Sequence, residues 1–166
     1  MHFNLLLLIV CVLVCEAAGG IGGIFTAFSE SAWFKSLRKP VLQPPGRVVG
    51  PIWAGIYALM GAALYLVWRM PSDAPGRKIA LILFALQLIL SVLWPFFFLK
   101  MRHPFIAYVE LLIMWMTLLG TMIGFAYLSP PCLFLLAPVW LWVTFEAYLN
   151  FATVSLNDGR IPTTQP

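Results

Sequence analysis

Side chains suited to ligand binding recur at a spacing of four in the apolar segment 132–156, and they are Pro138, Trp142, Glu146 and Asn150. Residues four apart lie on one face of a helix. An indole beside a carboxyl and an amide combines an apolar surface with a few polar groups, which is the usual lining of a small-molecule pocket. We therefore predict that this face, with the adjoining Leu149, binds a ligand.

Two other apolar segments repeat this pattern. Segment 48–69 carries Trp53, Tyr57, Gly61 and Tyr65, and segment 78–99 carries Gln87, Ser91, Trp94 or Pro95, and Phe98. Aromatic stripes are more often simple packing, and that alternative stays open. However, Trp and Tyr in membrane proteins gather mainly at the membrane interface, whereas Trp53, Trp94 and Trp142 fall inside their segments. This placement favours an aromatic cavity.

Three acids also lie inside apolar segments: Glu16, Glu110 and Glu146. A charge at the centre of a membrane costs about 2.5–3.5 kcal/mol on insertion scales, so such residues usually face protein or water. The structural alternative is a protonated carboxyl bonded to a neighbouring helix, and we favour it for Glu16. Because Glu146 shares the face of Trp142, we predict that it lines the ligand cavity.

The sequence shows no other recognisable reactive group. It has no Ser/His/Asp or Cys/His arrangement, no zinc-ligand spacing and no phosphate-binding glycine loop. The three cysteines, Cys11, Cys15 and Cys132, lie in apolar segments and are typical of small packing residues. His2 and His103 lie at the chain end and in a loop, so we expect neither a metal site nor haem ligation.

The elements that carry these residues are membrane spans. Of the 166 residues, 62% are hydrophobic and only 10% are charged, whereas a soluble domain carries about 25% charged residues. Apolar runs long enough to cross a bilayer cover 4–28, 48–69, 78–99, 104–128 and 132–156. We predict an all-α integral membrane protein, a bundle of five transmembrane helices in one domain (1–157), followed by a polar tail (158–166).

The loops predict the topology. The loop 29–49 carries many bulky apolar residues and should fold back over the bundle. Basic residues number seven on the side of this loop and the tail, against three on the opposite side. The positive-inside rule then places the C-terminus in the cytoplasm and the N-terminus outside. The first apolar segment is expected to be retained, and the lack of an Arg-rich transit peptide favours a prokaryotic inner membrane. Because the basic residues form short clusters, nucleic-acid binding is not expected.

Glycines 19, 20, 22 and 23 in the first span allow close helix approach. We favour packing within one bundle, with a homodimer contact as the alternative.

The order and spacing of several motifs resemble those of the translocator protein family, also called tryptophan-rich sensory proteins or peripheral benzodiazepine receptors. The matching stretches are 33–40, 44–45, 50–53, Tyr57, 60–61, 65–68, 87–88, 94–95, 110–112, Pro138, Trp142, Phe145 and 149–150. The resemblance implies five transmembrane helices, a first loop that lids a pocket, and frequent dimerisation. It implies binding of porphyrins such as protoporphyrin IX, of isoquinoline carboxamides or benzodiazepines, and of sterols.

By the same resemblance, the pocket includes Trp53, Trp142, Glu146 and Leu149, with Val49, Gly50, Ile52 and Ile113 as further candidates. Together with the residues singled out above, we predict ligand contacts also from Leu42, Tyr57, Ser91, Trp94 and Asn150. Some bacterial members are reported to degrade protoporphyrin with light and oxygen, and the tryptophans implicated there match Trp53 and Trp142.

The sequence also departs from the family pattern. Leu42 stands where an aromatic residue is common, Ser91 where Asn is usual, and Glu146 where a small Ala or Thr is usual. A carboxyl at 146 should weaken ligands with apolar or anionic groups there and favour a donor or a cation. No basic residue follows Phe151 until Arg160, so high-affinity sterol binding is not expected.

We therefore predict a membrane receptor, sensor or carrier for porphyrin-like and other hydrophobic ligands, without a resident cofactor. The alternatives are an enzyme that degrades protoporphyrin IX in light, a proton-coupled transporter that uses Glu16, Glu110 or Glu146, and a packing-only scaffold.

Overall fold

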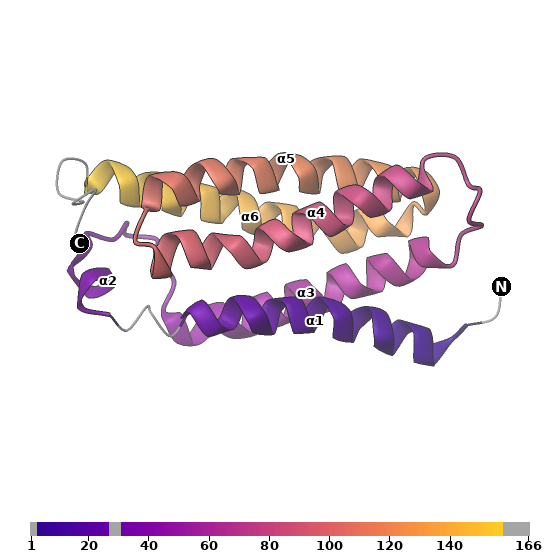
Figure 1. Cartoon of the computed structure of the whole chain (residues 1–166), viewed down its shortest axis with the longest axis horizontal. Coiled ribbons are helices and arrows are strands. Elements are labelled where there is room, and N and C mark those ends of the chain that lie inside the picture. Colours follow the sequence, from indigo (N-terminus) through magenta and orange to yellow (C-terminus); the bar gives the residue numbers. More distant parts are fainter. Residues whose placement is uncertain (1–2, 27–30, 158–166) are drawn as a thin grey trace.

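The computed structural model describes residues 3–26 and 31–157, and the predicted polar tail at 158–166 lies outside the described residues. The regular elements are α1 (Leu5–Thr26), α2 (Ala32–Ser36), α3 (Gly46–Trp68), α4 (Arg77–Pro95), the π-helical η2 (Phe96–Lys100), α5 (Pro104–Leu128) and α6 (Pro131–Leu156). They run up and down along one long axis (Figure 1). α4 continues into η2, and the two together form one helical segment. With α1, α3, α5 and α6, this makes five segments among the described residues that are long and apolar enough to span a membrane. The predicted fold class is confirmed.

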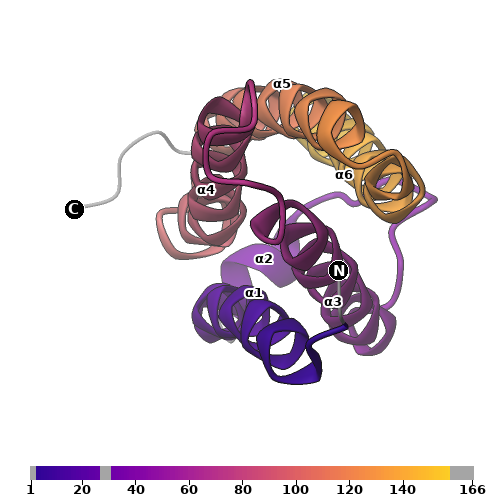
Figure 2. The same ribbon diagram turned by 90° about the vertical axis from the view of Figure 1, so that its right-hand side faces the viewer.

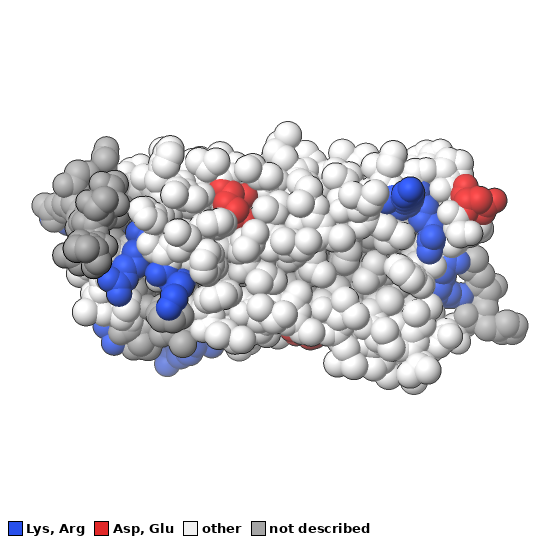
Figure 3. Space-filling model, viewed as in Figure 1, with Lys and Arg blue, Asp and Glu red and all other residues white. Residues whose placement is uncertain are grey.

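The charged side chains agree with a membrane-spanning bundle. On the face shown in Figure 3, Lys and Arg gather at the two ends of the molecule and a broad band without them lies between. A band without basic side chains between two basic ends matches the hydrocarbon core and its two interfaces.

The helices do not pack in chain order: α1 lies between α3 and α4, and α6 closes the bundle against α3. α1 lies against α3, while α4, α5 and α6 form an arc on the other side (Figure 2). Phe84 of α4 stacks on Phe125 of α5, with ring centroids 5.3 Å apart. At Gly61, a side chain would collide with the backbone of Val12 in α1. The glycine therefore permits the close contact of α1 and α3.

Pro95 changes the geometry at the end of α4. A proline inside a helix removes a backbone hydrogen bond and crowds the preceding turn. The chain responds by widening into the π-helical turn of η2. The wider turn leaves Trp94 and Phe98 stacked, with centroids 5.2 Å apart. Both rings lie beside the interior of the bundle.

The first loop folds back over one end of the bundle, as predicted. Its helix α2 begins at Ser31, whose hydroxyl accepts a hydrogen bond from Phe34 N at 3.3 Å. Farther along, Asn157 at the end of α6 accepts from Arg38 N (3.0 Å) and donates to Arg38 O (2.9 Å). These two bonds tie the loop to the last helix.

Candidate ligand-binding site

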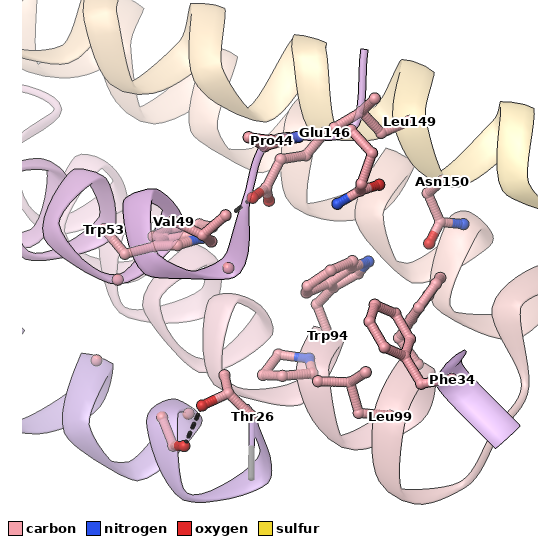
Figure 4. Close-up of a pocket in the computed structure, with 18 of the residues that line it drawn as sticks. Thr26, Phe34, Pro44, Val49, Trp53, Trp94, Leu99, Glu146, Leu149 and Asn150 are labelled. Carbon is pink, nitrogen blue, oxygen red and sulfur yellow. Dashed lines mark hydrogen bonds between the residues drawn. The ribbon is translucent and has the colours of Figure 1, made fainter. Parts of the chain in front are cut away.

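A cavity of about 1160 Å³ lies inside the loop end of the bundle. Its walls come from α1, α3, α4 with η2, and α6, and the first loop closes over it (Figure 4). The aromatic residues that line it are Phe34, Trp53, Tyr57, Trp94 and Phe98. Pockets for small molecules commonly measure about 300–1,000 Å³, so this cavity can take a large ligand.

The carboxyl of Glu146 is the centre of the polar lining. Trp53 Nε1 of α3 donates to Glu146 Oε1 at 3.1 Å, and Trp142 Nε1 donates to the same oxygen at 3.0 Å. Glu146 is only 6% exposed. Two indole donors on one buried oxygen hold the carboxyl in a fixed orientation and join α3 to α6.

A second polar contact joins α3 to α4. The Tyr57 hydroxyl donates to Ser91 Oγ at 3.2 Å, and Ser91 donates in turn to Leu88 O at 2.7 Å. The Tyr57 ring lies 5.5 Å from that of Trp53. A side chain on Gly19 of α1 would collide with the Tyr57 ring. The glycine therefore lets α1 pack on this aromatic pair, as packing within one bundle predicts.

Three buried polar atoms of cavity residues have no hydrogen-bond partner among the described residues: Glu146 Oε2, Asn150 Oδ1 and Trp94 Nε1. The amide nitrogen of Asn150 donates to Pro104 O at 2.9 Å, which fixes the orientation of its side chain. Buried polar groups in native proteins are nearly always paired, so such atoms call for an explanation.

Basic side chains lie at the loop end of the cavity. Lys35, Lys39 and Arg47 line it, and Lys39 Nζ stands 4.2 Å from the centroid of the Phe34 ring. Arg38, whose backbone is hydrogen-bonded to Asn157, does not line the cavity. In the described part of the chain, no group of three His, Cys, Asp or Glu side chains is placed to hold a metal ion.

Comparison with known proteins identifies the family. The sequence profile of the TspO/MBR family matches residues 11–156. The chain belongs to the TspO/MBR family. It is 34% identical to the tryptophan-rich protein TspO of Chlorobaculum tepidum, over 95% of this chain and 99% of that one. It is 33% identical to the translocator protein of sheep, over 89% and 88% of the two chains. Protein CrtK of Rhodobacter capsulatus is 28% identical over 97% and 99%.

Family membership and the five apolar helices make the chain a multi-pass integral membrane protein and support a role as a membrane sensor or receptor. The resemblance inferred from the sequence motifs is confirmed.

Most of the residues predicted to contact a ligand line this cavity. Those that line it are Val49, Gly50, Trp53, Tyr57, Ser91, Trp94, Glu146, Leu149 and Asn150. They come from three helices that are far apart in sequence, which is why the helical spacing of each segment was informative.

Four predicted contacts do not line the cavity. Leu42 is 59% exposed, because a turn closed by Gln43 N and Pro40 O places it at the outer tip of the loop. Ile52 packs against the hydrophobic core beside Trp53. Ile113 is 50% exposed on α5, a helix that lines no part of the cavity among the described residues.

Trp142 is the fourth and the most instructive. Its ring packs, half-buried, against the core, and it reaches the site through the N–H that it donates to Glu146. The prediction that Trp142 lines the pocket is therefore wrong. Trp94 stands in the cavity wall instead.

Sequence reasoning missed the contribution of α1. Glu16, Gly20, Gly23 and Thr26 line the cavity, although Glu16 was expected to bond to a neighbouring helix. The spacing of Glu16 and Gly20 was the available signal, since residues four apart share a face. Glu110, by contrast, lies buried outside the cavity with neither oxygen paired to a described residue.

Proposed function

We propose that this protein is a membrane receptor or carrier that binds porphyrin-like and other flat hydrophobic molecules in the cavity beneath the first loop. The observation that carries the proposal is the lining itself. Trp53, Tyr57 and Trp94 present aromatic surface within one large lidded hollow. Aromatic contacts contribute about 0.5–1.5 kcal/mol each beyond the area they bury, so a flat ring system suits this lining.

The charges support a particular orientation of such a ligand. Lys39 and Arg47 line the cavity at its loop end. Glu146 lines it from α6 (Figure 4). A carboxylate on the ligand edge would pair with the basic side chains. Porphyrins such as protoporphyrin IX carry two propionates on one edge of a flat apolar ring and fit this distribution.

The test is a titration of the purified protein in maltoside micelles with protoporphyrin IX, followed by quenching of tryptophan fluorescence. We expect saturable quenching in the wild type. Trp53→Leu and Trp94→Leu should each weaken binding by about 2- to 12-fold, as expected for the loss of one aromatic contact. Trp68→Leu is the control, because Trp68 is half-exposed at the far end of α3, outside the cavity lining.

Unsaturable quenching in the wild type would refute the proposal. Equal dissociation constants for all three variants would refute this cavity as the site. The dissociation constant is compared, not the depth of quenching, because each variant removes one fluorophore.

We also propose that the loop end of the bundle faces the cytoplasm. The described basic residues at that end are Lys35, Arg38, Lys39, Arg47, Lys100 and Arg102, and those at the other end are Arg69, Arg77 and Lys78. Cytoplasmic loops carry the excess of Lys and Arg. Since the native cysteines are buried, an impermeant maleimide added to intact spheroplasts should label Ala74→Cys and leave Ser36→Cys unlabelled. The reverse pattern would invert the topology.

A further inference from the structure

Glu146 Oε2 and Asn150 Oδ1 are two buried acceptors without a partner among the described residues, and both residues line the cavity. The two residues are four apart on α6, hence one turn from each other on the same face. Both are buried, with exposed fractions of 6% and 2%, and neither oxygen has a partner among the described residues. Both residues line the cavity and are drawn there in Figure 4.

Neither acceptor can turn away to find another partner. Glu146 Oε1 is occupied by the indole N–H groups of Trp53 and Trp142. The Asn150 amide nitrogen is held by Pro104 O. The free oxygen of each group is therefore fixed, and a ligand that supplies a donor gains a hydrogen bond that the empty site lacks.

We infer that the cavity selects hydrophobic ligands that carry a basic amine, with the ammonium donating to Glu146 Oε2 and Asn150 Oδ1. This inference rests on the proposed ligand-binding function. An ammonium has several donors and no acceptor, so it matches two acceptors one turn apart. The aromatic faces of Trp53, Tyr57 and Trp94 in the same lining further favour a cation.

The inference does not depend on the protonation state of the empty site. If the carboxyl is ionised, it pairs directly with the ammonium. If it is protonated, the proton passes from Oε2 to the amine nitrogen, whose lone pair forms the new N–H bond while the O–H bond breaks. Both routes end in the same ion pair, and a buried charge is tolerated when it is paired and hydrogen-bonded.

The other charges in the lining fix which end of the ligand carries the amine. Lys35, Lys39 and Arg47 lie at the loop end and repel an ammonium there. Glu16 of α1 is a second carboxyl of the cavity. The amine should therefore point toward α6, away from the loop.

The test uses two matched probes, 1-pyrenemethylamine and 1-pyrenemethanol, which share one ring and differ only in the terminal group. Binding in maltoside micelles is measured by energy transfer from tryptophan to pyrene. The quantity compared is the ratio of the two dissociation constants, because the partition of each probe into micelles is the same for every variant. In the wild type, we expect the amine to bind about tenfold tighter or more, as for hydrogen bonds to a charged group.

Glu146→Gln keeps the size of the side chain and an oxygen that can accept from the two indoles. It should reduce the preference for the amine probe over the alcohol probe to about twofold or less, because hydrogen bonds between neutral groups contribute little net energy. Glu110→Gln is the matched control, a buried carboxyl outside the cavity that should leave the preference intact. Glu16→Gln should retain most of it. In the wild type alone, the trimethylammonium analogue of the probe, which has charge but no N–H, should bind more weakly than the primary amine.

An equal preference in wild type and Glu146→Gln would overturn the inference, as would a trimethylammonium probe that binds as tightly as the primary amine. If protoporphyrin IX still quenches saturably in that case, the proposed function stands and only the amine selectivity falls. If neither the pyrene probes nor protoporphyrin IX bind, both fall together.

Discussion

The shared oxygen of Glu146 predicts a measurable coupling between α3 and α6. Glu146→Leu removes the acceptor of two indole N–H groups, those of Trp53 and Trp142. Interhelical hydrogen bonds in membrane proteins contribute about 0.6 kcal/mol on average and up to about 1.7 kcal/mol. We expect the substitution to lower the free energy of unfolding by about 1–3 kcal/mol for two such bonds.

A double-mutant cycle isolates the bond between the helices. Glu146→Leu is combined with Trp53→Phe, which keeps a ring but loses the N–H. Because the second substitution removes a bond already broken by the first, the combined loss should fall short of the sum by about 0.6–1.7 kcal/mol. Losses caused by altered packing in each single variant largely cancel in the cycle.

The assay is reversible unfolding by SDS in mixed maltoside micelles, followed by far-ultraviolet circular dichroism. The control cycle pairs Glu146→Leu with Trp68→Phe, fifteen residues beyond Trp53 on α3 and therefore about 22 Å farther along the helix axis. Distant sites add within about 0.3–0.5 kcal/mol. A Glu146–Trp53 cycle that is equally additive would refute the claim that this carboxyl joins the two helices.

Two further substitutions probe the frame around the site. Gly61→Ala should destabilise the bundle by about 1–3 kcal/mol, since its Cβ meets the backbone of Val12. The control is Gly55→Ala on the same helix, whose Cβ meets nothing within 4 Å and which should be neutral or stabilising by up to about 1 kcal/mol. Equal midpoints of SDS unfolding for the two variants would contradict this prediction. Asn157→Ala breaks both hydrogen bonds to the Arg38 backbone. Backbone deuterium exchange of residues 37–45 should therefore quicken, and protoporphyrin IX should dissociate faster in stopped-flow measurements. Unchanged rates would show that the loop is held by other contacts.

The sequence was most informative about the spans. Long apolar runs interrupted by Pro, Gly and charge specify membrane helices almost without tertiary information. Helical spacing also placed Trp53 with Tyr57, and Glu146 with Asn150, on the faces that line the cavity. These predictions succeeded because both features depend only on local geometry and hydrophobicity.

The errors arose where tertiary contacts decide. Trp142 shares a face with Glu146 but turns its ring into the core and offers only its N–H, a rotamer choice set by neighbouring helices. Leu42 lies at the tip of a turn whose direction depends on how the loop is tied to α6. Whether Ile113 lines the cavity depends on which helices surround it, and the spacing of residues within one segment does not specify that arrangement.

The position of the cavity follows from the distribution of glycine contacts along α1 and α3. Toward the end distant from the loop, Gly61 brings the two backbones into direct contact. Nearer the loop, Gly19 meets a ring of Tyr57, a side chain that intervenes between the helices. Still nearer, Gly23 and Gly50 line the cavity, and a side-chain carbon on either would meet nothing within 4 Å. Glycine therefore accompanies close helix packing at one end of the bundle and open space at the other. The group that faces each glycine determines which of the two occurs. Small residues on α1 widen the hollow where α3 no longer fills it, and Glu146, Leu149 and Asn150 of α6 line it as well.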